Sequence, residues 1–313
     1  MKKRVVITGL GAITPVGNNI GETWNSLING VSGIAQITNF DTSELSSQIA
    51  GQIKDYKAED HFEARETRKL DIYTQYSMIA AREAVRDAGL TPQGQDGRRI
   101  GVITGVGIGG IYTFDEECVK NHTKGPRRIS PFFIPKMIGN IAAAHIAIEN
   151  GFKGINFNVM SACASANHAI GTAFRSIQYG DADIIISGGT EAAVTPLAIG
   201  GFCAMRALST RNDEPQKASR PFDAERDGFV MSEGAAFLIL EELEHAKARG
   251  AKIYAELAGY GASDDAFHIT APLEDGSGSA EAVPIQPPPS GLRQISCPPD
   301  LRSQISWTRV LPV

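Results

Sequence analysis

Residues 155–191 contain the pattern that most restricts the fold of this chain. The apolar stretch 155–159 alternates in part and predicts a strand, and residues 160–166 have almost no side-chain bulk. A helical period continues over 164–178 to Gly180, a typical helix stop, and 182–189 predicts a buried strand. This order places Cys163 at or near the N-terminus of a helix.

Cys163 has two interpretations at this point. Unpaired N–H groups and the helix dipole at a helix N-terminus favour a thiolate, and small neighbours let a substrate carbonyl approach the sulfur. A single cysteine among alanines is more often a small buried hydrophobic residue. Spacing alone leaves both interpretations open and favours the second.

Strands and helices alternate along most of the chain. We expect strands at 3–8, 100–104, 155–159, 182–189, 234–241 and 253–261, and helices at 20–29, 71–88, 131–149 and 164–178. Ser130 followed by Pro131 is a good helix start. Alternation of this kind predicts an α/β fold, with a mainly parallel sheet and helices on its faces.

The composition excludes several classes of protein. A net charge of -5 gives no reason to expect nucleic-acid binding. The four cysteines show neither metal-type pairing nor a disulfide framework, so we expect no metal and a reducing compartment, the cytoplasm. The basic start followed by 5–7 superficially suggests a signal peptide, but Gly9, Gly11 and Pro15 interrupt the apolar run. No stretch is apolar for long enough to span a membrane.

The residues around Cys163 resemble a known family. The run Ser161-Ala-Cys-Ala-Ser-Ala166, followed by His168-Ala-Ile-Gly171, closely resembles the nucleophile motif of the β-ketoacyl-acyl-carrier-protein synthases, in particular the synthase II branch. The resemblance implies a thiolase-like fold built from two similar halves. It also implies that Cys163 accepts an acyl group from a thioester, that malonyl-carrier protein then condenses with it after losing carbon dioxide, and that the enzyme is a homodimer without a cofactor.

Further residues match positions that the family uses for its substrates. Ile108, Phe133 and Phe202 match the acyl-chain pocket, with Phe133 reaching across a dimer. Acyl-carrier protein is the implied partner, and the basic residues that match its docking positions are Arg65, Arg68, Lys69, Arg127, Arg128 and Arg206. Ordinary core packing for the first set and a solvated charged face for the second are the alternatives.

The resemblance ends near residue 283. We expect 1–250 to form the N-terminal half with the nucleophile, 251–283 to begin the C-terminal half, and 284–313 to be a proline-rich tail unlike the family. The family's Asn-Ala-His-Gly-Thr-Ser-Thr-Pro motif, its Lys-containing Thr-Gly-His motif and its Gly-Phe-Gly-Gly-Thr-Asn loop are absent from these 313 residues. A truncated, frameshifted or rearranged gene is our hypothesis, and a natural divergent tail is the alternative.

The missing motifs limit the chemistry that we expect. They carry the family's two condensing histidines, and the remaining histidines do not replace them. We expect His168, five residues after Cys163, to pack or cap, and His268 to belong to a surface ion pair. The chain is therefore expected to keep the nucleophile and to be defective in condensation.

Other functions are alternatives to that of a synthase. A non-catalytic truncated product, or a pseudoenzyme that binds acyl-carrier protein or a full-length partner, is the main alternative. A thiolase acting on coenzyme A thioesters fits the residues around Cys163 less well. The glycine-rich run 105–110 follows a strand, but no acidic residue lies at the distance that a dinucleotide site needs.

Overall fold

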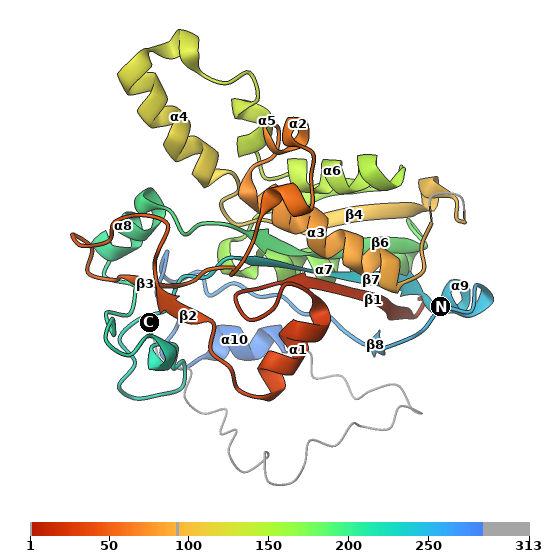
Figure 1. Cartoon of the computed structure of the whole chain (residues 1–313). Coiled ribbons are helices and arrows are strands. Elements are labelled where there is room, and N and C mark those ends of the chain that lie inside the picture. Colours follow the sequence, from red (N-terminus) through yellow and green to blue (C-terminus); the bar gives the residue numbers. More distant parts are fainter. Residues whose placement is uncertain (1, 92–93, 284–313) are drawn as a thin grey trace.

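A six-stranded sheet forms the centre of the molecule, in the order β5-β4-β6-β7-β1-β8 (Figure 1). The computed structural model describes residues 2–91 and 94–283. The strands of this sheet are β1 (Val5–Ile13), β4 (Ile100–Gly105), β5 (Asn156–Val159), β6 (Ile184–Glu191), β7 (Gly234–Glu242) and β8 (Ala255–Leu257). A separate antiparallel pair consists of β2 (Ile34–Gln36) and β3 (Ile49–Gly51).

Helices precede, connect and cover these strands. They are α1 (Ile20–Ile28), α2 (Ala64–Thr67), α3 (Ile72–Asp87), α4 (Ile111–Lys124), α5 (Phe133–Met137), α6 (Ile141–Asn150), α7 (Ser165–Tyr179), α8 (Pro196–Ala204), α9 (Leu243–Ala248) and α10 (Ser277–Ala282). Short 3-10 turns cover Ala58–Asp60, Gly97–Arg99, Pro126–Arg128, Ala162–Ala164 and Pro215–Lys217.

Four of the six strands run in one direction. β5, β4 and β6 are neighbours and pair in parallel. β7 is antiparallel to both β6 and β1, so β1 points the same way as the first three, and β8 is antiparallel to β1. The expected α/β fold with a mainly parallel sheet is confirmed in these directions. The carboxyl ends of β5, β4 and β6 consequently meet at one edge of the sheet.

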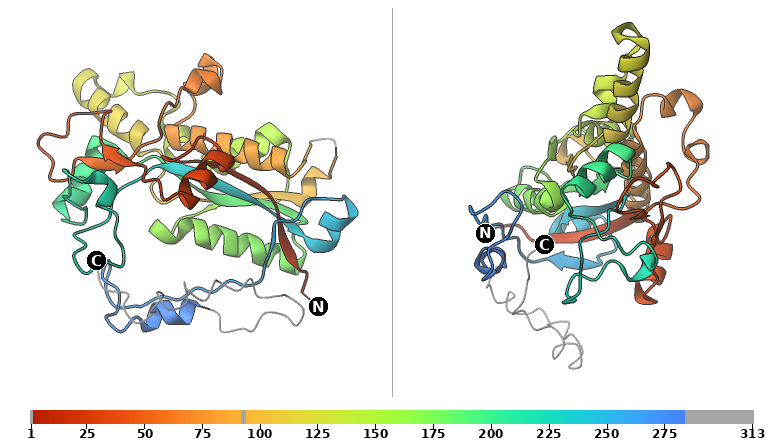
Figure 2. Two further views of the ribbon diagram at one scale, coloured as in Figure 1. Left: turned by 60° about the horizontal axis from the view of Figure 1, so that its bottom comes forward. Right: turned by 90° about the vertical axis from the view of Figure 1, so that its left-hand side faces the viewer.

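The sheet lies between two layers of helices. α3 packs on β1, β6 and β7, and α6 packs on β4 and β5, both on one face. α7 packs on β4 and β6 from the other face. Figure 2, left, shows α3 in orange above the sheet and α7 in green below it. Both faces of the central strands are therefore buried, which explains their continuous apolar runs.

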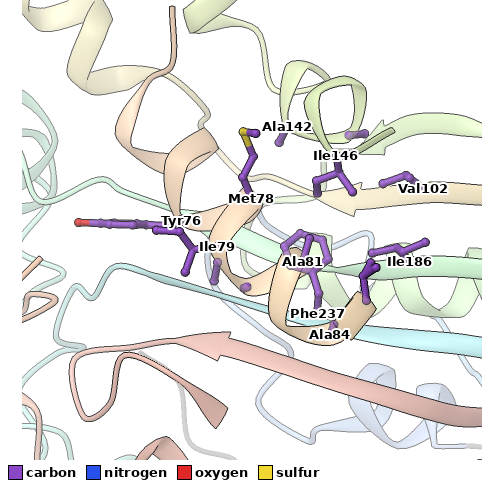
Figure 3. Packing of buried hydrophobic residues seen from close by; sticks show 14 of the residues in the cluster. Tyr76, Met78, Ile79, Ala81, Ala84, Val102, Ala142, Ile146, Ile186 and Phe237 are labelled. Carbon is purple, nitrogen blue, oxygen red and sulfur yellow. The ribbon is translucent and has the colours of Figure 1, made fainter. Parts of the chain in front are cut away.

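The larger apolar cluster fills the space between α3, α6 and the sheet. Met78, Ile79, Ala81 and Ala84 of α3 belong to it, together with Phe237 of β7 (Figure 3). Small residues let the helix approach β1 closely, since a Cβ on Gly11 would overlap the backbone carbonyl of Ala80. These contacts fix α3 against the strands that carry the candidate site.

One expected helix is wrong in its extent. The single helix predicted for 131–149 is two helices, α5 and α6, separated by residues 138–140. Ile138 has an extended backbone, and the carbonyl of Met137 accepts a hydrogen bond from Gly110 N–H at 3.0 Å. That carbonyl binds the loop after β4 instead of continuing a helix, which a sequence period does not reveal.

The expected strand at 253–261 is also too long. Only Ala255–Leu257 pairs, opposite Val5–Ile7, and β1 begins at Val5, so no partner continues past Leu257. Tyr260 instead packs onto Gly171 of α7. α4 and α8 were not predicted. The predicted proline-rich tail 284–313 lies outside the described residues.

Candidate active site

Cys163 lies on the turn that joins β5 to α7. The turn Ala162–Ala164 follows β5, and α7 begins at the next residue. Ala162 has φ of 49°, and a non-glycine residue held in the left-handed region costs on the order of 1–3 kcal/mol. Cys163 is exposed and in no disulfide. The cysteine thus lies at a helix start, as predicted, and the interpretation as a buried small residue is wrong.

The side chain of Ser165 stabilises this strained turn. Its Oγ accepts a hydrogen bond from Ser161 N–H at 2.9 Å and donates one to the carbonyl of Ala162 at 2.7 Å. Ser165 is buried, whereas Cys163 points to the surface. The local hydrogen bonds are made by the neighbours, so the sulfur is accessible on a turn whose backbone is held from inside.

Two glycines of the sheet let the start of α7 lie against it. Gly105 at the end of β4 and Gly189 of β6 are register partners. A Cβ on Gly105 would lie 2.5 Å from the backbone nitrogen of Ala166, and a Cβ on Gly189 would lie 2.7 Å from the Cβ of Ala166. Both distances are too short for real atoms. The absence of side chains at these positions therefore sets the height of Cys163 above the sheet.

The loop after β4 lies beside the cysteine turn at the carboxyl edge of the sheet. Residues 107–109 point three successive backbone N–H groups at Glu191, the last residue of β6. A Cβ on Gly107 would lie 3.4 Å from the carbonyl oxygen of Ala162. Ligands in open parallel sheets bind at this edge. The N–H groups of residues 107–109 are occupied by the protein's own carboxylate.

Sequence reasoning did not identify Glu191. Burial raises the pKa of its carboxyl group above the ordinary value, and the hydrogen bonds from Gly109, Ile108 and Gly107 oppose that rise. The only sequence signal was an acidic residue two positions after the pair of glycines that ends the predicted strand 182–189. That signal was too weak to distinguish a surface carboxylate from a half-buried one.

The three predicted acyl-pocket residues come from three different elements. Ile108 is in the loop next to Cys163 and is 42% exposed. Phe133, at the start of α5, has its ring centroid 6.5 Å from that of Phe114. Phe202, in α8, meets Phe229 edge to face at 5.3 Å. Only Ile108 is placed beside the cysteine turn by these contacts.

A cavity of about 580 Å³ lies between α4 and the segment that begins α8. Its lining includes Tyr112 and Glu116 on one side and Thr195 and Pro196 on the other. Ile111, the first residue of α4, packs against the same apolar cluster as Phe202. The acyl-pocket residues Ile108, Phe133 and Phe202 do not line this cavity, so their assignment stays a prediction.

The predicted docking residues are all exposed. Arg65 and Arg68 belong to or follow α2, and Lys69 places its ammonium group 5.9 Å from the ring centroid of Phe132, just before α5. Arg127 and Arg128 are in the 3-10 turn that leads to the same helix. Figure 1 shows α2 beside α5. Five of the six residues thus come from two neighbouring segments.

The sixth docking residue is on another element. Arg206 follows α8, and its φ of 55° lies in the left-handed region. It adjoins Cys203 and Phe202, which pack on a different apolar cluster from α2 and α5. Arg206 thus lies on a different element from the other five docking residues.

The histidines near the site make local contacts. The Nδ1 atom of His168 lies 2.7 Å from the Oγ of Ser161, and its ring meets Tyr260 edge to face at 6.3 Å. Within the described residues His268 belongs to no ion pair, contrary to our expectation. Its Nδ1 accepts backbone N–H groups from Thr270 at 3.1 Å and Ala271 at 3.0 Å, because the loop folds back on it.

Neither a metal site nor a membrane-spanning helix is seen in the described part of the chain. Residues 2–91 and 94–283 contain no group of three or more histidine, cysteine, aspartate or glutamate side chains that could hold a metal ion. No helix among them is long and apolar enough to cross a membrane.

An exposed cysteine thus lies on a strained turn at the carboxyl edge of a layered α/β sheet. The chain belongs to the β-ketoacyl synthase family, since the model "Beta-ketoacyl synthase, N-terminal domain" matches residues 2–246. It is 49% identical over 282 residues to the 3-oxoacyl-[acyl-carrier-protein] synthase 2 of Vibrio cholerae, covering 90% of this chain and 68% of that protein. It is 50% identical to the enzyme of the same name from Staphylococcus aureus strain N315, with the same coverage.

Solved structures agree with this assignment. The ishigamide ketosynthase/chain length factor superposes with a TM-score of 0.82 at 34% identity, covering 90% of this chain and 68% of that one. A second match comes from the structure of a type II polyketide acyl-carrier protein in complex with its ketosynthase bound to the hexaketide. Its TM-score is 0.78 at 38% identity, and the match covers 90% of this chain and 69% of that one. The expected family and the thiolase-like fold of the described part are confirmed. The chain spans about two thirds of the length of these relatives.

Proposed function

We propose that this chain carries the acyl-transfer step of a type II 3-oxoacyl-carrier-protein synthase of fatty-acid elongation, with Cys163 as the acceptor of acyl groups from acyl-carrier-protein thioesters. The observation that carries the proposal is the exposed thiol on the strained turn at the start of α7. The names of the relatives that are about half identical support the substrate class. We also propose that residues 1–250 form the N-terminal half of the synthase and that residues 251–283 begin its C-terminal half.

The acyl-transfer step uses the turn and the helix start together. The thiolate of Cys163 attacks the thioester carbonyl, a new carbon–sulfur bond forms, and the bond to the carrier's sulfur breaks. The carrier leaves as a thiolate and takes up the proton that Cys163 lost. The backbone N–H of Cys163 itself is a donor for the oxygen that becomes negative during the attack, and the dipole of α7 favours negative charge at this end.

The condensation step is proposed to be defective in these 313 residues by themselves. Decarboxylation of a malonyl thioester needs donors aimed at the developing enolate, and the family motifs that carry two histidines are absent from the sequence. His168 bonds to Ser161, and His268 bonds to its own loop. We therefore propose slow self-acylation without chain elongation.

Acyl-carrier protein is the proposed partner. A structural relative is seen in complex with its acyl-carrier protein. Arg65 in α2, Arg68 and Lys69 directly after it, and Arg127 and Arg128 before α5 give an acidic protein local basic segments. Arg206 is proposed as a further contact. The enzyme is proposed to act as a homodimer in the cytoplasm, where free thiols such as Cys118 and Cys203 stay reduced.

The test is incubation of the purified chain with octanoyl-carrier protein, followed by intact mass measurement and peptide mapping. We expect one octanoyl group on Cys163, and none on a Cys163→Ser variant. A Cys203→Ser variant should be acylated like the unaltered chain, because Cys203 is outside the turn. Acylation elsewhere, or carrier binding without any acylation, would overturn the proposal and favour the non-catalytic alternative.

A second measurement addresses condensation separately. Malonyl-carrier protein is added to the acylated chain, and products are separated by mass. We expect no 3-oxoacyl-carrier protein to form above the level of the Cys163→Ser variant. Formation of 3-oxoacyl product would show that the chain condenses and would reject the proposed defect, while leaving acyl transfer in place.

A further inference from the structure

Glu191 fills an anion site formed by three consecutive backbone N–H groups. Its Oε2 accepts hydrogen bonds from Gly107 at 2.8 Å and Ile108 at 2.9 Å, and its Oε1 accepts one from Gly109 at 3.0 Å. Successive N–H groups that converge in this way bind anions strongly. A protein side chain occupies the position, so the carboxylate acts on the loop and not on a ligand.

The loop held by Glu191 has little other means of staying ordered. Ile108 is the only residue with a side chain among 107–110, because its neighbours Gly107, Gly109 and Gly110 have none. Glycines leave the backbone free to adopt many conformations. Gly109 in fact has φ of 85°, which other residues rarely adopt. The position of the Ile108 side chain therefore depends on contacts that the loop makes with its surroundings.

Three structural elements fix this loop. The carboxylate of Glu191 holds it from β6. The carbonyl of Met137 in α5 accepts Gly110 N–H at 3.0 Å. On the third side Gly107 adjoins the carbonyl of Ala162, the residue before Cys163. The loop thus connects the cysteine turn to α5, and Ile108 projects from its middle with 42% of its surface exposed.

We propose that Glu191 is a positioning residue that holds Ile108 at a set place beside Cys163 and thereby determines which acyl-chain lengths the cysteine accepts. The inference rests on the proposed role of Cys163 as acyl acceptor. An acyl chain on the sulfur must pass the nearest apolar side chains, and Ile108 is the bulky one on the adjoining loop. A displacement of the Ile108 side chain changes the space available to the acyl chain more than it changes the access of a small reagent to the sulfur of Cys163.

The charge of Glu191 matters as well as its size. A glutamine has one acceptor oxygen, so its amide N–H₂ would face at least one of the three backbone N–H groups. Two donors facing each other repel, and a buried N–H without an acceptor is costly. The isosteric Glu191→Gln substitution should therefore release part of the loop while conserving the volume of the side chain.

The test is a competition among hexanoyl-, octanoyl-, dodecanoyl- and hexadecanoyl-carrier protein for Cys163. We expect Glu191→Gln to change the ratio of long to short acyl groups by about tenfold, the discrimination that one methylene gives in an apolar pocket. Alkylation of Cys163 by iodoacetamide, a small probe, should stay within about twofold because the cysteine turn is held separately by Ser165.

Glu233→Gln is the matched control. Glu233 is also a half-buried carboxylate at this end of the sheet, and burial raises its pKa, but it accepts Ile53 N–H at 2.9 Å and does not touch the loop. We expect this variant to lose stability without changing the acyl-length ratio. An equal change in both variants would reject a specific role for Glu191.

The remaining outcomes separate the two proposals. If the unaltered chain is not acylated at Cys163, the proposed function fails. If it is acylated and Glu191→Gln keeps the same acyl-length ratio, the inference about Glu191 is wrong. Should Glu191→Gln not fold, Gly107→Ala takes its place, since a Cβ there would lie 2.9 Å from Glu191 Oε2 and displace the carboxylate. An unchanged ratio in that variant would likewise refute the inference.

Discussion

Replacing Gly105 with alanine tests whether the contact between β4 and α7 positions the nucleophile. The new Cβ would lie 2.5 Å from the backbone nitrogen of Ala166 and 2.5 Å from the carbonyl oxygen of Ser165. Both atoms belong to the first turn of α7, directly after Cys163. Gly105 has no left-handed backbone that alanine would strain, so the effect comes from the contact alone.

The size of the effect follows from the distance. Ordinary contact begins at 3.4 Å, so the strand and the helix start must separate by about 0.9 Å. Overpacking of this kind costs about 1–3 kcal/mol. The smaller conformational freedom of alanine in the unfolded chain offsets about 0.4–1 kcal/mol of it. We expect a net loss of about 1–2 kcal/mol in the free energy of unfolding, which lowers Tm by about 2–3 °C at an unfolding entropy of about 2.1 cal/mol/K per residue.

The substitution should affect the rate of acyl transfer to Cys163 more strongly than it affects the free energy of unfolding. A misplacement of about 1 Å costs on the order of 100-fold in rate where a reacting group must be oriented. We therefore expect octanoyl transfer to Cys163 to slow by at least about tenfold at a temperature where the variant stays folded. The assay combines thermal unfolding followed by circular dichroism with the time course of acylation followed by mass.

Gly201→Ala is the control for this substitution. Gly201 is in α8, and a Cβ there would have no atom within 4 Å. Alanine is favoured over glycine in a helix by up to about 1 kcal/mol, so this variant should be as stable as the unaltered chain or slightly more stable. A Gly105→Ala variant with unaltered Tm and unaltered acylation rate would refute the reasoning that close packing sets the position of Cys163.

Two further substitutions test other parts of the structure. Glu241 is fully buried and accepts two hydrogen bonds from Arg249 at 2.7 Å, so Glu241→Gln should cost about 2–3 kcal/mol in urea unfolding, the range for bonds to charged groups. Burial raises the pKa of Glu241, but hydrogen bonds led by that of Arg249 bring this pKa below its ordinary value. The stabilisation is therefore present above about pH 4.3, the ordinary pKa of a glutamate, and is lost as the pH falls below it. The Glu241→Gln variant should consequently lose less stability than the unaltered chain between neutral pH and pH 3, and an equal loss in both would contradict this. Replacing Arg68 and Lys69 together with glutamate should abolish carrier binding in a pull-down or calorimetric titration, whereas Arg98→Glu, an exposed control before β4, should leave binding unchanged.

Local sequence patterns predicted much of the fold because they depend only on residues that are close together in the sequence. The helices at 20–28, 72–87 and 165–179 and the buried strands β4, β6 and β7 agree with the expected ranges to within about two residues. Their apolar periods and helix stops, such as Gly180, act within a single element. The break at 138–140 was missed because a distant N–H, that of Gly110, takes the carbonyl of Met137.

The candidate site was predictable only where one short segment contains it. Cys163, its small neighbours and the helix that follows are contiguous, so the position of Cys163 at a helix start could be predicted directly. Glu191 and the loop 107–109 are 82 to 84 residues apart and meet only because β4 and β6 are parallel neighbours. A hydrogen bond over that separation leaves no local period in the sequence, and the half-buried carboxylate of Glu191 was therefore missed.

The sequence by itself determined the alternation of strands and helices, the small-residue run around Cys163 and, through that run, the family. The tertiary structure decided what lies beside the cysteine and how far from the sheet it is held. Gly105 and Gly189 pair across two strands, and Glu191 binds a loop from the neighbouring strand. Such contacts depend on strand order and register, because residues distant in the chain become neighbours only when parallel strands bring their carboxyl ends to one edge.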